Sequence, residues 1–123
     1  MKIHRHDPAR KISPTFSARL NEMGSRERVR AIVLLGTPDI AGEKAARQTR
    51  RQRREAVKAV QESAERALSE LDEVLARYGG SRLSERPDAL GAMPVETTPA
   101  GVRALARSRQ VRAIMEDQEA RLI

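Results

Sequence analysis

The chain has no cysteine and no tryptophan, and Phe16 and Tyr78 are its only aromatic residues. The absence of cysteine excludes disulfides, thiolate metal sites and a cysteine nucleophile. The only histidines, His4 and His6, lie in a polar stretch at the N-terminus, where chain ends are poorly ordered by default. A histidine-based catalytic triad and a histidine metal site have little to build on. We therefore expect no enzyme, no bound metal and no cofactor.

Long hydrophobic runs are also missing. The N-terminal residues MKIHRHDPARKISP are charged and lack the apolar centre of a secretory signal, and no stretch approaches the about 20 apolar residues of a membrane-spanning helix. We expect a cytoplasmic protein with no membrane partner. The 123 residues, 39% of them hydrophobic, suffice for one compact domain with a modest core of Ala, Val, Leu, Ile and Met.

The formal net charge of +7 is unevenly placed along the chain. Residues 44–54, KAARQTRRQRR, carry much of the positive charge, whereas residues 55–78 are net acidic. A solvated helix extension is the simplest interpretation of this basic block, because arginine is a good helix former and needs no partner. The basic side chains of the block are Lys44, Arg47, Arg50, Arg51, Arg53 and Arg54.

Capping residues and apolar periodicity predict the first elements. Residues 1–12 are expected to form a disordered leader, and Ser13-Pro14 then favours a short helix that stops at Gly24. Residues 29–35, VRAIVLL, are apolar on both faces, as is typical of an interior strand. Residues 42–78 have one apolar helical face, which predicts one long helix whose N-terminal third projects into solvent.

Strand and turn signals continue to the C-terminus. We expect strands at residues 81–85, 90–98 and 111–115, with a helix between the last two that Thr98 caps and that ends near Gln110. Pro94 has no N–H to donate to a sheet, so it demands an edge or a bulge. Gly79-Gly80 ends the long helix that precedes these strands.

The order strand, helix, strand, strand, helix, strand predicts an α+β fold. It is the ferredoxin-like split βαβ arrangement (βαββαβ), an antiparallel four-stranded sheet with two helices on one face. An extra N-terminal helix and an elongated first helix are added to this plan. We divide the chain into a basic leader with a short helix, residues 1–28, and the α+β domain, residues 29–123.

Residues 89–118, ALGAMPVETTPAGVRALARSRQVRAIMEDQ, resemble the C-terminal half of subtilisin propeptides and their free-standing inhibitor relatives. VRAIVLLG resembles the first strand of that family, so the resemblance spans residues 29–123. It implies a protein that inhibits a subtilisin-like serine protease, with a folding-chaperone role for that enzyme and a location that follows it. The long helix and the extra N-terminal helix depart from the family pattern.

The resemblance also implies roles for particular residues. The C-terminal tail is expected to lie in the protease cleft as a cleaved product does, held by backbone hydrogen bonds. Glu116 and Asp117 are expected to meet the N-terminus of a protease helix, where a carboxylate is favoured. The tail residues in the cleft are Ala120, Arg121, Leu122 and Ile123.

The sheet face opposite the helices is expected to dock on the protease. Alternation along the predicted strands selects four candidates for this face, Ile32, Leu34, Ala92 and Ile114. The pattern leaves open which set of alternate residues faces outward.

A different class of function stays open, a basic helical adaptor that binds nucleic acid or an acidic protein through residues 44–54. Sequence-specific RNA binding by the sheet is disfavoured, because the strands carry no aromatic residues on which bases stack. A third reading keeps the fold and makes the chain an interaction module in a larger assembly. Mutation of the tail and mutation of the basic block separate the first two classes.

Overall fold

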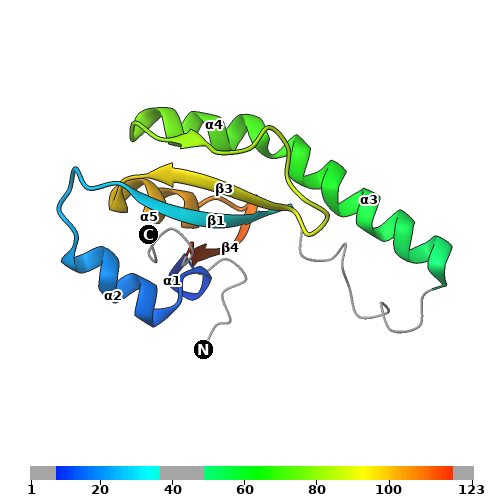
Figure 1. Ribbon diagram of the computed structural model, residues 1–123, viewed down its shortest axis with the longest axis horizontal. Helices are drawn as coiled ribbons and strands as arrows, with labels where there is room; N and C mark the ends of the chain where they lie inside the picture. The colour runs from blue at the N-terminus through cyan, green and yellow to red at the C-terminus, as the bar shows by residue number, and fades with distance from the viewer. Residues whose placement is uncertain (1–7, 37–48, 118–123) are drawn as a thin grey trace.

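Four strands form one antiparallel sheet, and helices cover one of its faces (Figure 1). The computed structural model describes residues 8–36 and 49–117. The strands lie in the order β2-β3-β1-β4, with each neighbouring pair antiparallel. This is an α+β fold of the ferredoxin-like type, which confirms the predicted fold class. The elements are α1 (Pro8–Lys11), α2 (Pro14–Glu22), β1 (Val29–Leu35), α3 (Arg50–Arg66), α4 (Leu68–Arg77), β2 (Ser81–Arg82), β3 (Ala92–Thr97), α5 (Pro99–Ala106) and β4 (Val111–Glu116).

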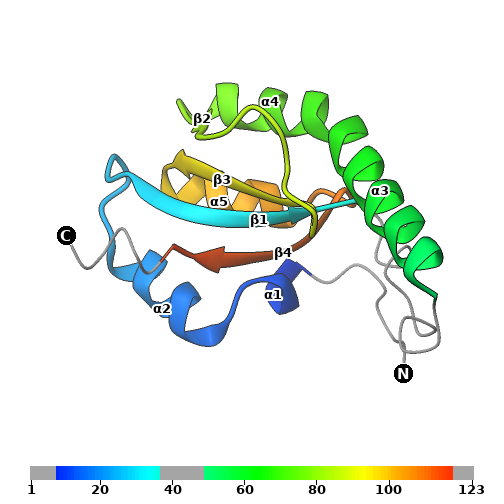
Figure 2. The same cartoon turned by 45° about the vertical axis from the view of Figure 1, so that its right-hand side comes forward.

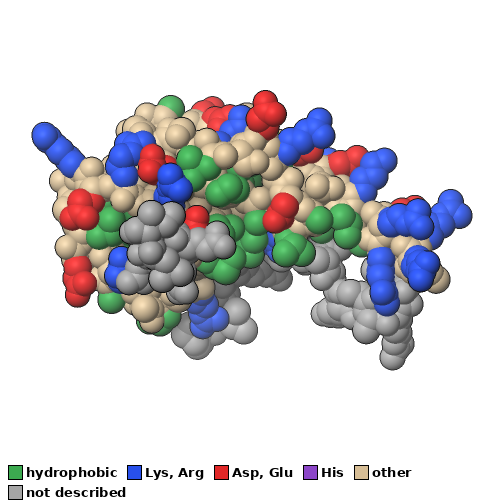
Figure 3. Space-filling model, viewed as in Figure 1, with side chains coloured by type: hydrophobic (Ala, Val, Ile, Leu, Met, Phe, Trp, Pro, Cys, Tyr) green, Lys and Arg blue, Asp and Glu red, His purple; other side chains and the backbone are tan. Residues whose placement is uncertain are grey.

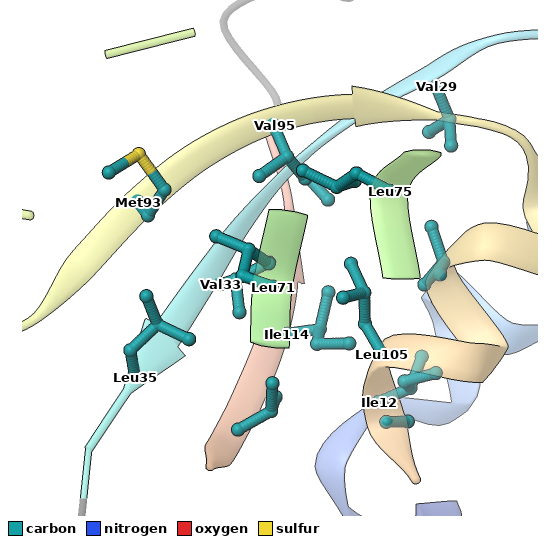
Figure 4. Packing of buried hydrophobic residues seen from close by; sticks show 14 of the residues in the cluster. Ile12, Val29, Val33, Leu35, Leu71, Leu75, Met93, Val95, Leu105 and Ile114 are labelled. Atoms are coloured by element: carbon teal, nitrogen blue, oxygen red, sulfur yellow. The ribbon is translucent and has the colours of Figure 1, made fainter. Parts of the chain in front are cut away.

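Alternation along the central strand β1 gives the sheet two different faces. Ala31, Val33 and Leu35 are buried, whereas Ile32 and Leu34 between them are only half-buried. The buried set joins one hydrophobic cluster with side chains of β3, β4, α4 and α5 (Figure 4). Leucines of α4 and α5 fill the helix side of this cluster, namely Leu71, Leu75 and Leu105. Among the described residues, no helix lies on the opposite face (Figure 2).

The N-terminal segment belongs to the same core. The Ser13 hydroxyl accepts a hydrogen bond from the Phe16 N–H at 3.1 Å, and Pro14 occupies the first turn, so the predicted helix start is confirmed. Phe16 and Leu20 are each 2% exposed within the main cluster. Ile12 forms a parallel bridge with Ile114 of the edge strand β4. Therefore the predicted boundary at residue 28 does not divide the core.

Helix α1 corrects the predicted leader as well. Residues 8–11 are helical and Ile12 is buried, so the expectation of disorder through residue 12 is wrong for the part that the structure describes. The Lys11 ammonium donates a hydrogen bond to the Ser108 carbonyl at 2.8 Å, which ties α1 to the loop after α5. Burial at this contact lowers the pKa of Lys11.

The predicted long helix is two helices. Within the described residues it begins at Arg50 and breaks at Ala67, which has φ −82° and ψ −8° and is buried. After the break, α4 runs along the sheet, whereas α3 extends beyond the end of the sheet (Figure 2). Thr49 and Gln52 form a capping box at the start of α3, with hydrogen bonds of 3.1 and 2.9 Å. The earlier part of the prediction, residues 42–48, lies outside the described residues.

Pro94 explains why β2 is short. It lies in β3, between β1 and β2, and its carbonyl accepts a hydrogen bond from the Leu83 N–H at 2.9 Å. In a hydrogen-bonded antiparallel pair, the residue opposite Leu83 would also donate its N–H to the Leu83 carbonyl. Pro94 has no N–H, so this second bond is missing. The ladder therefore ends, and β2 spans Ser81–Arg82 instead of the predicted residues 81–85. The helix α5 likewise ends at Ala106, one turn before the predicted Gln110.

Thr97 is held between two glycines at the end of β3. It is fully buried, and its hydroxyl has no hydrogen-bond partner within the described structure. A Cβ atom at Gly101 of α5 would lie 2.0 Å from the Thr97 Oγ1, and one at Gly80 would lie 2.8 Å from it. Only glycine at these two positions lets α5 and the end of α4 approach β3 so closely.

We expect Gly101→Ala to destabilise the protein by about 1–3 kcal/mol, although alanine is the better helix former, because the added methyl overpacks the core. Urea denaturation measures the change. Thr97→Ala in the same chain should remove most of the penalty, since it deletes the clashing hydroxyl. Gly24→Ala is the control, because its Cβ would meet Glu27 at an ordinary 3.5 Å. Equal effects at the two glycines would contradict this account of the contact.

Candidate functional site

The uncovered face of the sheet carries an apolar row that crosses β1, β3 and β4. Ile32 lies opposite Pro94 on one side and opposite Met115 on the other. Leu83, which follows β2 and bonds to Pro94, extends the row by one residue. Directly opposite residues of antiparallel strands project from the same face, so these four side chains form a line about 14 Å long at normal strand spacing.

A second apolar row lies beside the first. Leu34 pairs with Ala92 on one side and with Ala113 on the other, and these three residues are half-buried. Figure 3 shows hydrophobic side chains gathered over this part of the sheet. Contiguous exposed apolar surface of this kind marks interaction sites. We call the seven residues of the two rows the open-face patch: Ile32, Leu34, Leu83, Ala92, Pro94, Ala113 and Met115.

Exposure is greatest at the two ends of the first row. Met115 on the edge strand β4 is 47% exposed, and Leu83 at the opposite edge is 42% exposed. Both belong to the residues with large exposed hydrophobic side chains. A partner that covers the patch would remove more surface from solvent at these two side chains than at the others. They are therefore the best positions for testing contact.

A charged row borders the open-face patch. Arg30 lies opposite Glu96 and pairs with it at 3.8 Å, and Arg28 pairs with the same carboxylate at 3.3 Å. Asp117, just after β4, donates its N–H to the Arg30 carbonyl at 3.1 Å. These exposed ion pairs add little stability. They place a polar rim at the border where the chain leaves the sheet.

The structure separates the four residues predicted for the docking face. Ile32, Leu34 and Ala92 lie on the uncovered face, whereas Ile114 is 2% exposed in the core, so its predicted placement is wrong. Simple alternation from Val111 would turn Ile114 outward. The β1–β4 register shifts between Leu34 and Leu35, and this irregularity lets Val111 and Ile114 both face the core. Ala113 and Met115 take the outward positions of β4 instead.

The two adjacent acids predicted to contact a protease helix differ in their surroundings. Glu116 lies opposite Ala31 of the core face, and its side chain is only 7% exposed. Its Oε2 accepts a hydrogen bond from the Arg19 Nε at 2.9 Å, which fastens α2 to the end of β4. Glu116 is therefore engaged within the chain, and the structure contradicts its use as a free surface acid. Asp117 follows it as a half-buried residue at the rim.

The part of the basic block that the structure describes lies at the start of α3. Arg50, Arg51, Arg53 and Arg54 occupy its first turns and are exposed. The first buried residue of the helix is Val60. Lys44 and Arg47 lie outside the described residues, as do the tail residues Ala120, Arg121, Leu122 and Ile123. The capping signal at Thr49 was readable from the sequence and marks where the helix begins.

Residues 8–36 and 49–117 contain no group of three or more His, Cys, Asp or Glu side chains that would hold a metal ion. Among the helices in the same ranges, none has both the length and the apolar content of a membrane span. The open-face patch and the arginines of α3 are the two candidate binding surfaces.

Adjacent residues of β4 test the assignment of the two faces. We expect Ile114→Ala to cost about 2–5 kcal/mol of stability, because it opens a cavity in the core. Met115→Ala should stay within about 0.5 kcal/mol of the wild type, because Met115 is 47% exposed and lies outside the core. Chemical denaturation of both variants measures the difference. Similar losses for both, or a larger loss for Met115→Ala, would contradict the assigned register.

Comparison of the whole chain with known proteins returned no match to a family model, to a curated protein or to a solved structure.

Proposed function

We propose that the chain inhibits a subtilisin-like serine protease by docking its open-face patch on the enzyme. The observation that carries this proposal is the uncovered apolar face of the sheet. Ile32 and Leu34 of the central strand lie on that face, away from the helices, so a role in the core does not explain them. A folding-chaperone role for the same enzyme would use the same surface.

The shape of the patch suits a protein partner. Its side chains lie on strands in two neighbouring rows, with exposed Leu83 and Met115 at the ends and a charged rim along one border. An apolar centre with a polar rim is the usual construction of a protein–protein interface. Docking by a face is also favoured over adding a strand at β4, because Ile12 already bridges to Ile114 there.

The end of β4 supports the part that we assign to the C-terminal tail. The Asp117 N–H bonds to Arg30, so the chain leaves the sheet at the rim of the open-face patch. A partner docked on the patch would lie next to the residues that follow. In this proposal, residues 120–123 enter the protease cleft in the manner of a product, which the resemblance to subtilisin propeptides also implies. Inhibition would then be competitive with substrate.

The second candidate, a basic adaptor for nucleic acid or an acidic protein, draws on the exposed arginines of α3. It accounts for the basic block and leaves the open-face patch without a role. The protease proposal accounts for the patch and for the position of Asp117 at its rim. We therefore place the adaptor second.

The deciding experiment measures inhibition constants of the full chain and of a chain that ends at residue 119 against subtilisin-like proteases. We expect the full chain to inhibit and the shortened chain to lose inhibition at least about tenfold. Failure of the full chain against every enzyme of a broad panel would overturn the proposed function. Equal inhibition by the two chains would overturn the role of the tail.

A pair of arginine substitutions tests the docking face. Met115→Arg adds a charge to the patch and should weaken inhibition at least about tenfold, since the charge would be buried against the partner. Ala76→Arg adds the same charge at an exposed position on α4 and should inhibit like the wild type. Circular dichroism confirms folding of both variants. Equal weakening by both, or by neither, would show that the patch is not the docking surface.

A further inference from the structure

Helix α3 extends beyond the body of the domain. None of its residues from Arg50 to Ala59 is buried, and packing against the core begins at Val60. Ten residues of α-helix separate Arg50 from Val60, so the helix reaches about 15 Å past its first core contact. Figures 1 and 2 show this end projecting away from the sheet. Core packing therefore does not explain the first turns of α3.

The charges in the first turns are also unfavourable for the helix, apart from Arg51 and Glu55, which carry opposite charges four residues apart. The first turn contains no acidic residue and begins with Arg50 and Arg51, although the positive end of the helix dipole favours acids. Arg50 and Arg54, and then Arg54 and Lys58, are like charges four residues apart, which repel each other. The Thr49–Gln52 capping box holds the helix start against this repulsion. An anionic surface would relieve the repulsion directly.

We propose that Arg50, Arg51, Arg53 and Arg54 form an arginine arm that contacts an acidic surface region of the protease docked on the open-face patch. This inference rests on the proposed function. None of the four arginines forms an ion pair within the described residues, so all four guanidinium groups are available to a partner. Figure 3 shows the basic end of α3 and the hydrophobic surface over the sheet from the same side. One partner is thus able to meet both.

An acidic protein surface fits the arm better than nucleic acid does. The arginines span only five residues, about 6 Å of helix axis, which is short for tracking a phosphate backbone. Glu55, Glu62 and Glu65 follow on exposed positions of the same helix and would repel phosphates laid further along it. Base stacking also has no support in the open-face patch, because none of its seven residues is aromatic.

The arm should act mainly on the rate of association. Exposed charges at the border of an interface steer encounter and make the rate depend on salt, with smaller effects on dissociation. The protease that associates fastest should therefore carry acidic groups beside its substrate cleft. A protease with a basic surface there should associate more slowly with the wild-type chain than with a chain lacking the arm charges.

The test compares two variants that lose the same number of charges. One carries R50Q, R51Q, R53Q and R54Q; the control carries R26Q, R77Q, R86Q and R109Q, which are exposed positions scattered over the fold. Association rates are measured by progress curves with two subtilisin-like proteases, one acidic and one basic in surface charge. For the acidic enzyme at low salt, we expect the arm variant to associate about tenfold more slowly than the control. The gap should close at high salt.

The outcomes distinguish this inference from the function on which it rests. If wild type and both variants inhibit at equal rates at low salt, the arm is overturned and the inhibitor function stands. If the wild-type chain inhibits neither protease nor any other in the panel, both are overturned. Fluorescence titration with a 20-base-pair DNA duplex gives the remaining outcome. Duplex binding that only the arm variant loses, with inhibition rates unchanged, would assign the arm to nucleic acid instead.

Discussion

The fold depends on helices that pack on one face of the sheet and leave the other face open among the described residues. Helices α4, α5 and the N-terminal segment bury Ala31, Val33 and Leu35 of β1, and no helix in residues 8–36 and 49–117 covers the intervening Ile32 and Leu34. Because β1 has a strand on each side, every one of its side chains lies either in the core or on the uncovered face. Folding alone leaves the apolar residues Ile32 and Leu34 of the second face only half-buried. They are consistent with a surface that a partner covers.

The two edges of the sheet are both restricted for pairing with another chain. At one edge, Pro94 ends the ladder, so β2 offers only Ser81 and Arg82. At the other, Ile12 bridges to Ile114, and Glu116 is tied to Arg19 of α2. Short or covered edges are how sheets avoid pairing with other chains. With both edges restricted, the open-face patch and the projecting end of α3 are the surfaces to which we assign recognition.

Local chemistry made much of the fold predictable from the sequence. Ser13-Pro14 and Thr98-Pro99 fixed two helix starts, and the doubly apolar Val29–Leu35 indicated a central strand. Pro94 signalled a defect in the ladder without showing which neighbour would lose its partner. These signals depend on residues close in sequence, which is why they could be read without the structure.

The predictions that were wrong failed where tertiary contacts determine the structure. The break at Ala67 has no glycine or proline to mark it, and the apolar stripe continues across it. The irregular β1–β4 register turned Ile114 inward and Met115 outward, against simple alternation. Phe16 and Leu20 looked like part of a leader, because nothing local shows that they pack into the domain core. The residues of the open-face patch could be predicted only in part for the same reason, because strand pairing decides which of them lie side by side.

Methyl cross-saturation NMR tests the central claim that the uncovered face is the binding surface. The labelled chain is mixed with a subtilisin-like protease whose catalytic serine is replaced by alanine, and the protease protons are saturated. We expect the signals of Ile32, Leu34, Leu83 and Met115 to lose intensity, because their methyl groups lie in the open-face patch. Loss confined to Leu68 and Val74, which pack on the helix side of the core, would contradict the account.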